Sequence, residues 1–498
     1  MKYLLSFTAR YDGISRLKDN RWGFFPGVSV GWNIMEEDFW KESKVSDIVS
    51  NLKPRLSYGV NGNVNGIGNY EVYGEYAQVD AKTYGGATAL YNKKLLNTNL
   101  RWEQSQTFEV GLDIGFLQNR LSFILDFYSR RTKDLLTKQA LPGYTGFSDI
   151  VTNMGTLRNS GFEAEVKANI INKGGFTWDM TANITSVANK IISLPYNNVE
   201  NNRVGGYEVA AGKVDADGKF PTKWIAGRQE GGKLGELVGY RQQHVFKDWD
   251  DVKQHANLRV DEVANLYGPG LADQINPATG KTYKESSGWQ PIEPGDACWE
   301  DINGDNIING YDRSVMGNIF PNVTGGFSTT FGYKGLSLYA RFDYALGHTL
   351  YNDLKARSLG QYQGQFNIIT DVKDMWSEAN PNSDLTKFYY ADQLAKKNIT
   401  RSNNASTAAD NNSSRYYEKG DYLALREITL SYQLPKSLIS KAHLTEASVY
   451  VTGQNLFYIT GYDGVSPEPA VSTTYGRGID NGRYPTPRTF LFGLSLTF

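Results

Sequence analysis

The feature that most constrains this chain is a strict alternation of apolar and polar residues. In four windows every even-numbered residue is apolar or aromatic: 162–170, 176–184, 336–344 and 490–498. The residues between them are mostly polar or charged, as Glu163, Glu165 and Lys167 illustrate. Because successive side chains of a strand point to opposite faces, each window predicts a β-strand with one apolar and one hydrophilic face.

The length of these strands favours a membrane protein. Strands of soluble proteins average about five to six residues, whereas a tilted strand needs about 9–11 residues to cross a bilayer. We therefore predict an all-β fold, an antiparallel transmembrane β-barrel with its apolar face in lipid and its polar face around an aqueous lumen. A soluble β-sandwich also alternates, because one face of each sheet is buried, and it remains an alternative.

Thirteen segments qualify as strands. They are 3–12, 22–34, 54–64, 104–117, 120–131, 158–171, 174–187, 232–243, 321–333, 335–347, 421–434, 446–458 and 488–498. Bacterial barrels close with an even number of strands, so either one segment is miscounted or the sheet continues in other residues. Tight polar turns such as 173–175 suit the periplasmic side, and we expect 196–231, 244–320 and 348–420 outside the cell.

The composition excludes several classes of function. The chain has 498 residues, with 52 Lys and Arg against 53 Asp and Glu, which excludes a broad basic surface for nucleic acid. The chain has no run of about 18 uncharged apolar residues, so the sequence predicts no membrane-spanning helix. The four His and the single Cys298 form neither a zinc pattern nor a nucleophile motif. We predict no enzyme, no catalytic residues and no cofactor apart from the metal considered below.

The start of the chain already alternates like a strand, through Tyr3, Leu5 and Phe7. Its apolar stretch is too short for the 7–15 residues, roughly, of a signal-peptide core. Met1 is therefore expected to lie inside a structural element, and we expect an N-terminal part to precede it.

The long connections carry patterns of their own. The spacing of apolar residues in 366–376 predicts an amphipathic helix on the barrel mouth, and the Asn- and Ser-rich segment 398–415 predicts a flexible exposed tip. Four tryptophans fall in one connection and are candidate stacking platforms for a sugar ring: Trp224, Trp249, Trp289 and Trp299. Packing anchors for a large loop are the alternative role.

One loop has the spacing of calcium ligands. Side-chain oxygens recur at Asp301, Asn303, Asp305, Asn309 and Asp312, and the carbonyl of Ile307 fills the intervening position. Chains wrap around calcium in this way. Asn306 stands where the related helix-loop-helix pattern has Gly, and Asp312 where it has Glu. The alternative is a turn held by side-chain to backbone hydrogen bonds.

The chain end is the most specific local signal, because alternation runs up to an aromatic terminal residue, Phe498. It resembles the last strand that outer-membrane barrels present to their insertion machinery. Ordered matches elsewhere resemble the SusC/RagA group of TonB-dependent outer-membrane transporters over essentially the whole chain. They lie at 19–32, 100–103, 109–113, 119–128, 153–163, 295–313 and 453–456.

This resemblance implies that 1–498 is the C-terminal half of a 22-stranded barrel, with about 12–14 strands here. The regions 196–320 and 348–420 are expected to be long extracellular loop regions. The acidic loop resembles one that recurs in this family, in agreement with the calcium prediction from its spacing. The signal peptide, carboxypeptidase-like domain and plug of the family are not present in this chain.

The implied function is nutrient uptake through the cell outer membrane. Oligosaccharides, or peptides, would be captured with a SusD-like surface lipoprotein and imported with energy from the TonB complex, which the missing N-terminal part engages. A self-contained passive porin and a soluble glycan-binding β-protein are the alternative functions.

Overall fold

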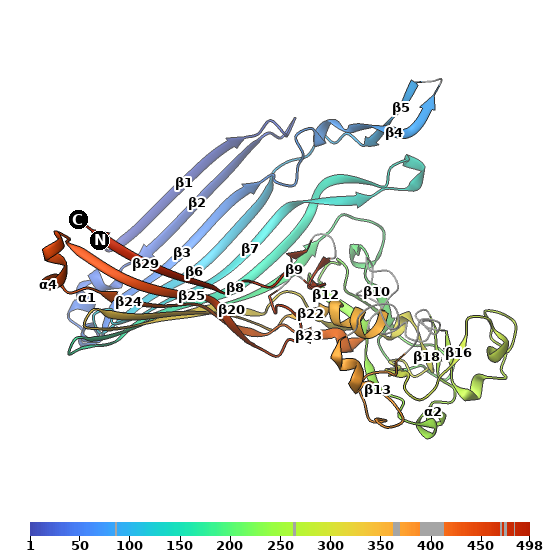
Figure 1. Ribbon diagram of the computed structural model, residues 1–498. Helices are drawn as coiled ribbons and strands as arrows, with labels where there is room; N and C mark the ends of the chain where they lie inside the picture. Colours follow the sequence, from blue (N-terminus) through green and yellow to red (C-terminus); the bar gives the residue numbers. More distant parts are fainter. Residues whose placement is uncertain are drawn as a thin grey trace.

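One large antiparallel sheet dominates the structure (Figure 1). The computed structural model describes residues 1–84, 87–261, 265–361, 369–388, 413–468, 471–472, 476–482 and 484–498. The sheet has twelve strands, in this order: β1 (Tyr3–Gly13), β2 (Trp22–Trp32), β3 (Val49–Asn63), β6 (Glu103–Phe116), β7 (Leu121–Ala140), β8 (Asp149–Lys173), β9 (Phe176–Ser193), β20 (Val323–Tyr333), β21 (Leu336–Leu346), β24 (Tyr422–Gln433), β25 (Glu446–Thr460) and β29 (Thr489–Thr497). Each strand pairs with the next strand of the sheet along the chain.

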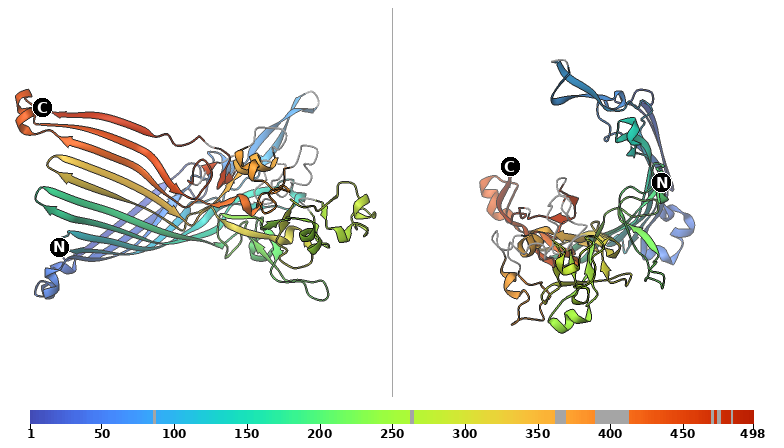
Figure 2. Two further views of the ribbon diagram at one scale, coloured as in Figure 1. Left: turned by 60° about the horizontal axis from the view of Figure 1, so that its bottom comes forward. Right: turned by 90° about the vertical axis from the view of Figure 1, so that its right-hand side faces the viewer.

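The sheet is bent into an open arc with β1 and β29 at its two ends (Figure 2). Both chain termini and the tight turns lie at one end of the strands, and the long connections gather at the other end (Figure 1). This second end is called the loop end below. The arrangement separates a region of short turns from a region of large loops, as the sequence predicts.

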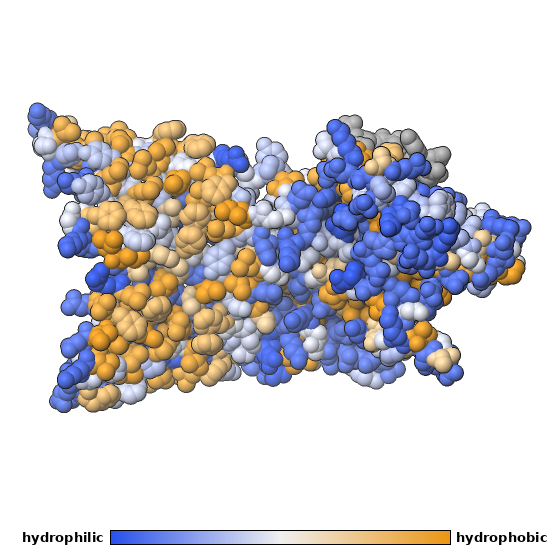
Figure 3. Space-filling view, turned by 90° about the horizontal axis from the view of Figure 1, so that it is seen from below, coloured by the Kyte–Doolittle hydropathy of each residue, from blue (hydrophilic) through white to orange (hydrophobic). Residues whose placement is uncertain are grey.

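Apolar side chains form continuous rows across one face of the sheet. Leu5, Val30, Leu56, Val110, Phe127 and Phe162 are successive register partners from β1 to β8. A second row continues from β9 to β29 through Trp178, Phe331, Leu338, Leu430, Val451 and Phe492. Leu5 is 77% exposed and Phe492 83% exposed. Figure 3 shows this apolar surface over the strands, with hydrophilic residues at the loop end.

Exposing an apolar surface of this extent to water is unfavourable. Monomeric soluble proteins rarely expose contiguous apolar patches larger than a few hundred Å². The exposed face spans all twelve strands of the sheet, so it matches the lipid-facing surface of a transmembrane barrel. The predicted fold class, all-β with an antiparallel transmembrane sheet, is confirmed.

Twelve of the thirteen predicted strands lie in this sheet. The prediction for 232–243 is wrong, because this segment forms β12 (Glu236–Tyr240) and the start of β13 (Gln242–Val245) in small separate sheets. Leu237, Val238 and Tyr240 are all buried there, so both faces of β12 pack against protein. Removing this segment resolves the odd total that the sequence produced.

The loop end contains the remaining strands, most of which are short. They are β4 (Glu75–Tyr84), β5 (Ala87–Lys94), β10 (Tyr207–Ala210), β11 (Thr222–Ile225), β14 (Arg259–Val260), β15 (Leu266–Tyr267), β16 (Gln290–Pro291), β17 (Ala297–Trp299), β18 (Ile307–Ile308), β19 (Arg313–Asn318), β22 (Thr349–Asn352), β23 (Tyr417–Lys419), β26 (Val471–Ser472), β27 (Gly476–Arg477) and β28 (Ile479–Asp480). A compact core around Tyr240, Phe246, Trp299 and Ile308 holds much of this region together.

The helices are short. The α-helices are α1 (Asp38–Lys41), α2 (Trp249–Gln254), α3 (Asp353–Ala356) and α4 (Lys436–Ile439), and Arg357–Gln361 forms a π-helix. Single turns of 3-10 helix occupy Ile34–Glu36, Lys44–Asp47, Glu71–Tyr73, Gly143–Thr145, Glu200–Asn202, Pro269–Leu271, Tyr283–Glu285, Gly310–Asp312, Thr370–Asp374, Ser414–Tyr416 and Ser440–Ala442. None of the helices in the described ranges is long and apolar enough to cross a membrane.

The predicted amphipathic helix at 366–376 is wrong where it can be seen. Residues 366–368 lie outside the described residues, and beyond them only Thr370–Asp374 forms a 3-10 turn. Met375 is buried in a cluster with Tyr351 and Leu359, so the apolar spacing reflects packing of an irregular segment. Most of the predicted flexible tip, 398–412, also lies outside the described residues.

Candidate functional site

The polar face of the sheet is held by an ion-pair network across three strands. Arg55 of β3 donates from Nε to Asp113 of β6 and from Nη2 to Asp126 of β7, both at 2.9 Å. Glu109 lies 3.7 Å from the same guanidinium. These charges occupy the face opposite the apolar rows, where a water-filled lumen solvates them.

The acidic loop at the loop end is tied together by its own side chains. Both carboxylate oxygens of Asp301 accept backbone N–H groups, from Gly304 at 2.6 Å and from Asn306 at 2.8 Å. Asn303 accepts from the N–H of Asp305 at 3.2 Å, and Asp305 accepts from that of Ile307 at 2.7 Å. This is a series of side-chain to backbone turns, the alternative that the sequence left open.

The end of the loop is buried. Asp312 is fully buried and accepts the N–H groups of Ile302 and Asn309, both at 2.9 Å. Burial raises the pKa of the Asp312 carboxyl to about 7, and the nearby carboxylates of Asp301 and Asp305 add to the rise. Asn309 caps the following turn by accepting from the N–H of Tyr311 at 2.8 Å.

The donors of this loop suit calcium better than a transition metal, because they are all oxygens. Each carboxylate oxygen has two lone pairs, so one remains after each backbone hydrogen bond. Within the part of the chain that the structure describes, no three His, Cys, Asp or Glu side chains converge on a common metal position. A calcium ion here therefore requires the Asn and carbonyl oxygens as ligands and a shift of the carboxylates.

The four candidate tryptophans lie in different surroundings. Trp299 is 3% exposed in the loop core, so the structure gives it the packing role. The guanidinium of Arg203 lies 3.5 Å from the ring centre of Trp224 and covers one face of that ring. Trp289 packs edge-on against Tyr283. Trp249 is 54% exposed at the start of α2 and presents a free aromatic surface.

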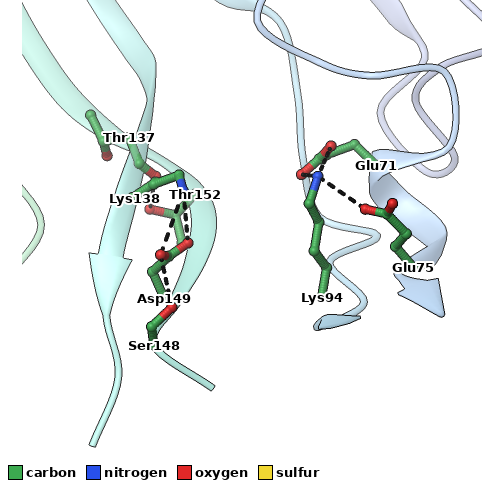
Figure 4. Close-up of polar contacts among 8 residues, drawn as sticks. All are labelled: Glu71, Glu75, Lys94, Thr137, Lys138, Ser148, Asp149 and Thr152. Carbon is green, nitrogen blue, oxygen red and sulfur yellow. Dashed lines mark hydrogen bonds and ion pairs between the residues drawn. The ribbon is translucent and has the colours of Figure 1, made fainter. Parts of the chain in front are cut away.

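A cavity of about 320 Å³ lies at the loop end, above the first strands of the sheet. Figure 4 shows charged residues from its two walls, with Lys138 and Asp149 on one side and Lys94, Glu71 and Glu75 on the other. On the first wall the ammonium of Lys94 lies 3.1 Å from Glu71 and 3.4 Å from Glu75. Hydrogen bonding to Glu71 raises the pKa of Lys94, although burial opposes it, so this lysine stays charged at neutral pH.

The second wall is the end of the β7–β8 hairpin. Lys138 lies 3.4 Å from Asp149 on the neighbouring strand, and Ser148 donates to the same carboxylate at 3.1 Å. Both strands extend past the length that a bilayer requires. A register shift beside Asp134, which has a φ of 56°, bends the hairpin where it leaves the sheet.

The chain segment that follows β5 connects the two walls, and its residues Leu95, Asn97 and Leu100 line the cavity. The segment after β5 passes beneath the cavity, and the side-chain amide of Asn97 donates to the carbonyl of Val151 at 2.7 Å. Leu100 is buried in a cluster with Leu17 and Val72, against which Val151 also packs. The cavity is thus formed by elements about fifty residues apart, with an apolar floor beneath its charged walls.

The sequence analysis did not single out the cavity residues. Lys93 and Lys94 are adjacent basic residues, but Glu71 and Asp149 stand in unremarkable loop sequence. The pairing of β4 with β5 places Lys94 beside Glu75, and the pairing of β7 with β8 places Lys138 near Asp149. The hydrogen bond from Asn97 to Val151 then joins the two hairpins.

Comparisons with known proteins agree with this architecture. The model of a family described as "TonB dependent receptor-like, beta-barrel" matches residues 2–278. The chain is 29% identical to TonB-dependent receptor P3 of Formosa agariphila, over 100% of the chain and 44% of that protein. It is 30% identical to TonB-dependent receptor SusC of Bacteroides thetaiotaomicron, over 100% of the chain and 42% of that protein.

Among solved structures, the RagAB peptide transporter superposes with a TM-score of 0.70 and 22% identity. The match covers 100% of this chain and 46% of that one. The chain therefore spans less than half the length of each of these three relatives.

Proposed function

Since the chain belongs to the family of TonB-dependent receptor-like β-barrels, of the SusC/RagA type, we propose that it takes part in TonB-dependent nutrient import. It is a protein of the cell outer membrane. The two faces of the sheet carry the proposal: continuous apolar rows for lipid and a charged wall for an aqueous passage.

We propose oligosaccharides as the imported nutrients, with peptides as the second candidate. The exposed ring of Trp249 and the polar cavity at the loop end support a ligand that is captured from outside the cell. The peptide candidate has the support of fold only, because the RagAB peptide transporter shares the architecture at 22% identity.

A SusD-like surface lipoprotein is the proposed partner. Exposed aromatic side chains at the loop end, including Tyr70, Tyr76 and Tyr144, are the kind of residue enriched in protein interfaces. Affinity purification of the receptor from outer membranes, in detergent, tests this partner. Recovery of such a lipoprotein at equal stoichiometry supports it, and recovery of the receptor alone contradicts it.

The import function is tested by deleting the gene and measuring growth on single nutrients. We expect loss of growth on one class of oligosaccharide, restoration by the wild-type gene, and no restoration in cells without a working TonB complex. Growth that returns without TonB contradicts energised import and favours the passive porin. Ion conductance of the purified protein in a planar bilayer then measures the porin activity directly.

A further inference from the structure

The cavity between the β4–β5 hairpin and the β7–β8 hairpin has the features of a ligand site. Its volume of about 320 Å³ lies at the lower end of the range of roughly 300–1,000 Å³ for small-molecule sites. The lining combines charged, polar and apolar residues: Glu71, Lys93, Lys94, Leu95, Asn97, Leu100, Lys138, Phe147, Ser148, Asp149, Ile150 and Val151. Its three lysines outnumber its two carboxylates, so the lining has a small excess of positive charge.

Two of these lysines are weakly held. Lys138 is 70% exposed and lies 3.4 Å from Asp149, and Lys93 is half exposed at 3.6 Å from Glu75. Exposed ion pairs of this kind contribute little to stability, so exchanging the carboxylate partner costs little. Anionic groups of a ligand that enters the cavity can therefore pair with the ammonium group of either wall.

The carboxylates of the lining restrict the ligand further. Glu71 and Asp149 can accept hydrogen bonds but cannot donate them when ionised. A fitting ligand therefore carries hydroxyl donors beside its negative charge. The ring of Phe147 and the side chains of Leu95 and Leu100 add apolar surface, which the carbon face of a sugar ring can cover.

We propose that this cavity binds acidic sugar units, with a carboxylate on each or most rings, of an oligosaccharide that the receptor imports. The inference rests on the proposed function and names the class of its substrate. An acidic peptide satisfies the lysines as well, but its side chains have no donors for Glu71 and Asp149.

The test is isothermal titration of the receptor, purified intact from outer membranes in detergent. The probes are a galacturonic acid oligomer, a neutral glucose oligomer of the same length and a glutamic acid oligomer. We expect the galacturonate to bind most tightly and its affinity to fall in high salt, because salt screens exposed charges. Tighter binding of the neutral oligomer or of the glutamate peptide overturns the proposal.

Variants locate the binding. Lys138→Gln should weaken galacturonate binding about tenfold, which corresponds to about 1.4 kcal/mol. Adding Lys93→Gln to this variant should weaken the binding further. Lys441→Gln is the matched control, because this exposed lysine lies at the opposite end of the strands. Unchanged affinity in both cavity variants, with unchanged heat-shifted mobility on gels, places the ligand elsewhere and overturns the proposal.

The result is separable from the proposed function. A receptor that imports a neutral glycan in a TonB-dependent way but does not bind galacturonate disproves the cavity inference alone. A receptor that binds galacturonate in the cavity yet supports no TonB-dependent uptake disproves the import function and leaves the binding site in place.

Discussion

At the scale of single residues, spacing in the sequence predicted which side-chain oxygens lie in the acidic loop. It did not predict whether they bind a metal ion or accept backbone hydrogen bonds. The oxygens of the acidic loop lie on one short segment, as expected, yet Asp301 and Asp312 direct both carboxylate oxygens to backbone N–H groups. Spacing cannot separate these two uses, because a metal loop and a turn require the same residue types.

We expect calcium to bind this loop and to raise the unfolding temperature of the receptor, since binding to the native state alone stabilises it. Asp305→Asn should reduce calcium affinity about tenfold or more, because affinity in such loops depends on the number of charged ligands. Asp217→Asn, in another loop-end turn, is the control. Titration calorimetry with chelator-treated protein measures the calcium affinities, and thermal unfolding with and without calcium measures the stabilisation. An absence of heat on calcium addition refutes the metal prediction.

The tryptophans divide by burial. Trp299→Ala should destabilise the loop core by about 3–5 kcal/mol, because it removes a large buried ring. Trp249→Ala should change stability by less than about 0.5 kcal/mol, as exposed substitutions usually do. Hydrogen exchange of 236–320 reports this difference while the barrel stays folded. Equal protection in the two variants contradicts the packing role of Trp299.

At the scale of elements, the sequence predicted the strands well and the loops poorly. Period-two alternation is a strong signal where one face meets lipid and the other meets water, and twelve of the predicted segments lie in the sheet. The segment 232–243 failed because β12 is buried on both faces. The helix at 366–376 failed because apolar spacing also arises in irregular chain that packs on a core.

Substitutions on the two faces of one strand test which face of the sheet meets lipid. Phe327 lies in the middle of β20 on the apolar face, between Ala182 and Phe342. Phe327→Arg should destabilise the inserted barrel by about 2–4 kcal/mol, as charges near the bilayer centre do. Thr330→Arg is the control, because it points to the polar face next to Asp179. Urea unfolding in lipid vesicles measures the stability of both variants. Equal destabilisation would contradict the assignment of Phe327 to the lipid-facing side and of Thr330 to the polar side.

At the scale of the whole molecule, the cavity lay beyond sequence reasoning, whereas the open edges of the sheet agree with the expectation that it continues in other residues. The cavity depends on how two hairpins separated along the chain bend toward each other. The edges depend on the order of the strands: β1 and β29 each have a partner on one side only among the described strands. Because unpaired backbone groups in lipid cost several kcal/mol each, further strands must cover both edges in the membrane.

The strand order limits what can cover these edges. With twelve antiparallel strands, β1 and β29 run in opposite directions, so an even number of added strands closes the barrel. Two solutions fit: strands from the rest of a longer receptor, or the edges of a second copy of this sheet. We expect the first, because the relatives are more than twice as long as the part that matches.

Cysteine cross-linking separates the two solutions. Thr8→Cys in β1 combined with Ser495→Cys in β29 places a thiol on the polar face of each edge. Oxidation should leave the receptor monomeric, whereas closure by two copies should produce disulfide-linked dimers in non-reducing gels. The native Cys298 adds little background, because burial raises its pKa to about 12 and keeps the thiol protonated. Ser6→Cys with Ser495→Cys repeats the test at a shifted register, and dimers in either pair would show that this sheet closes with its own copy.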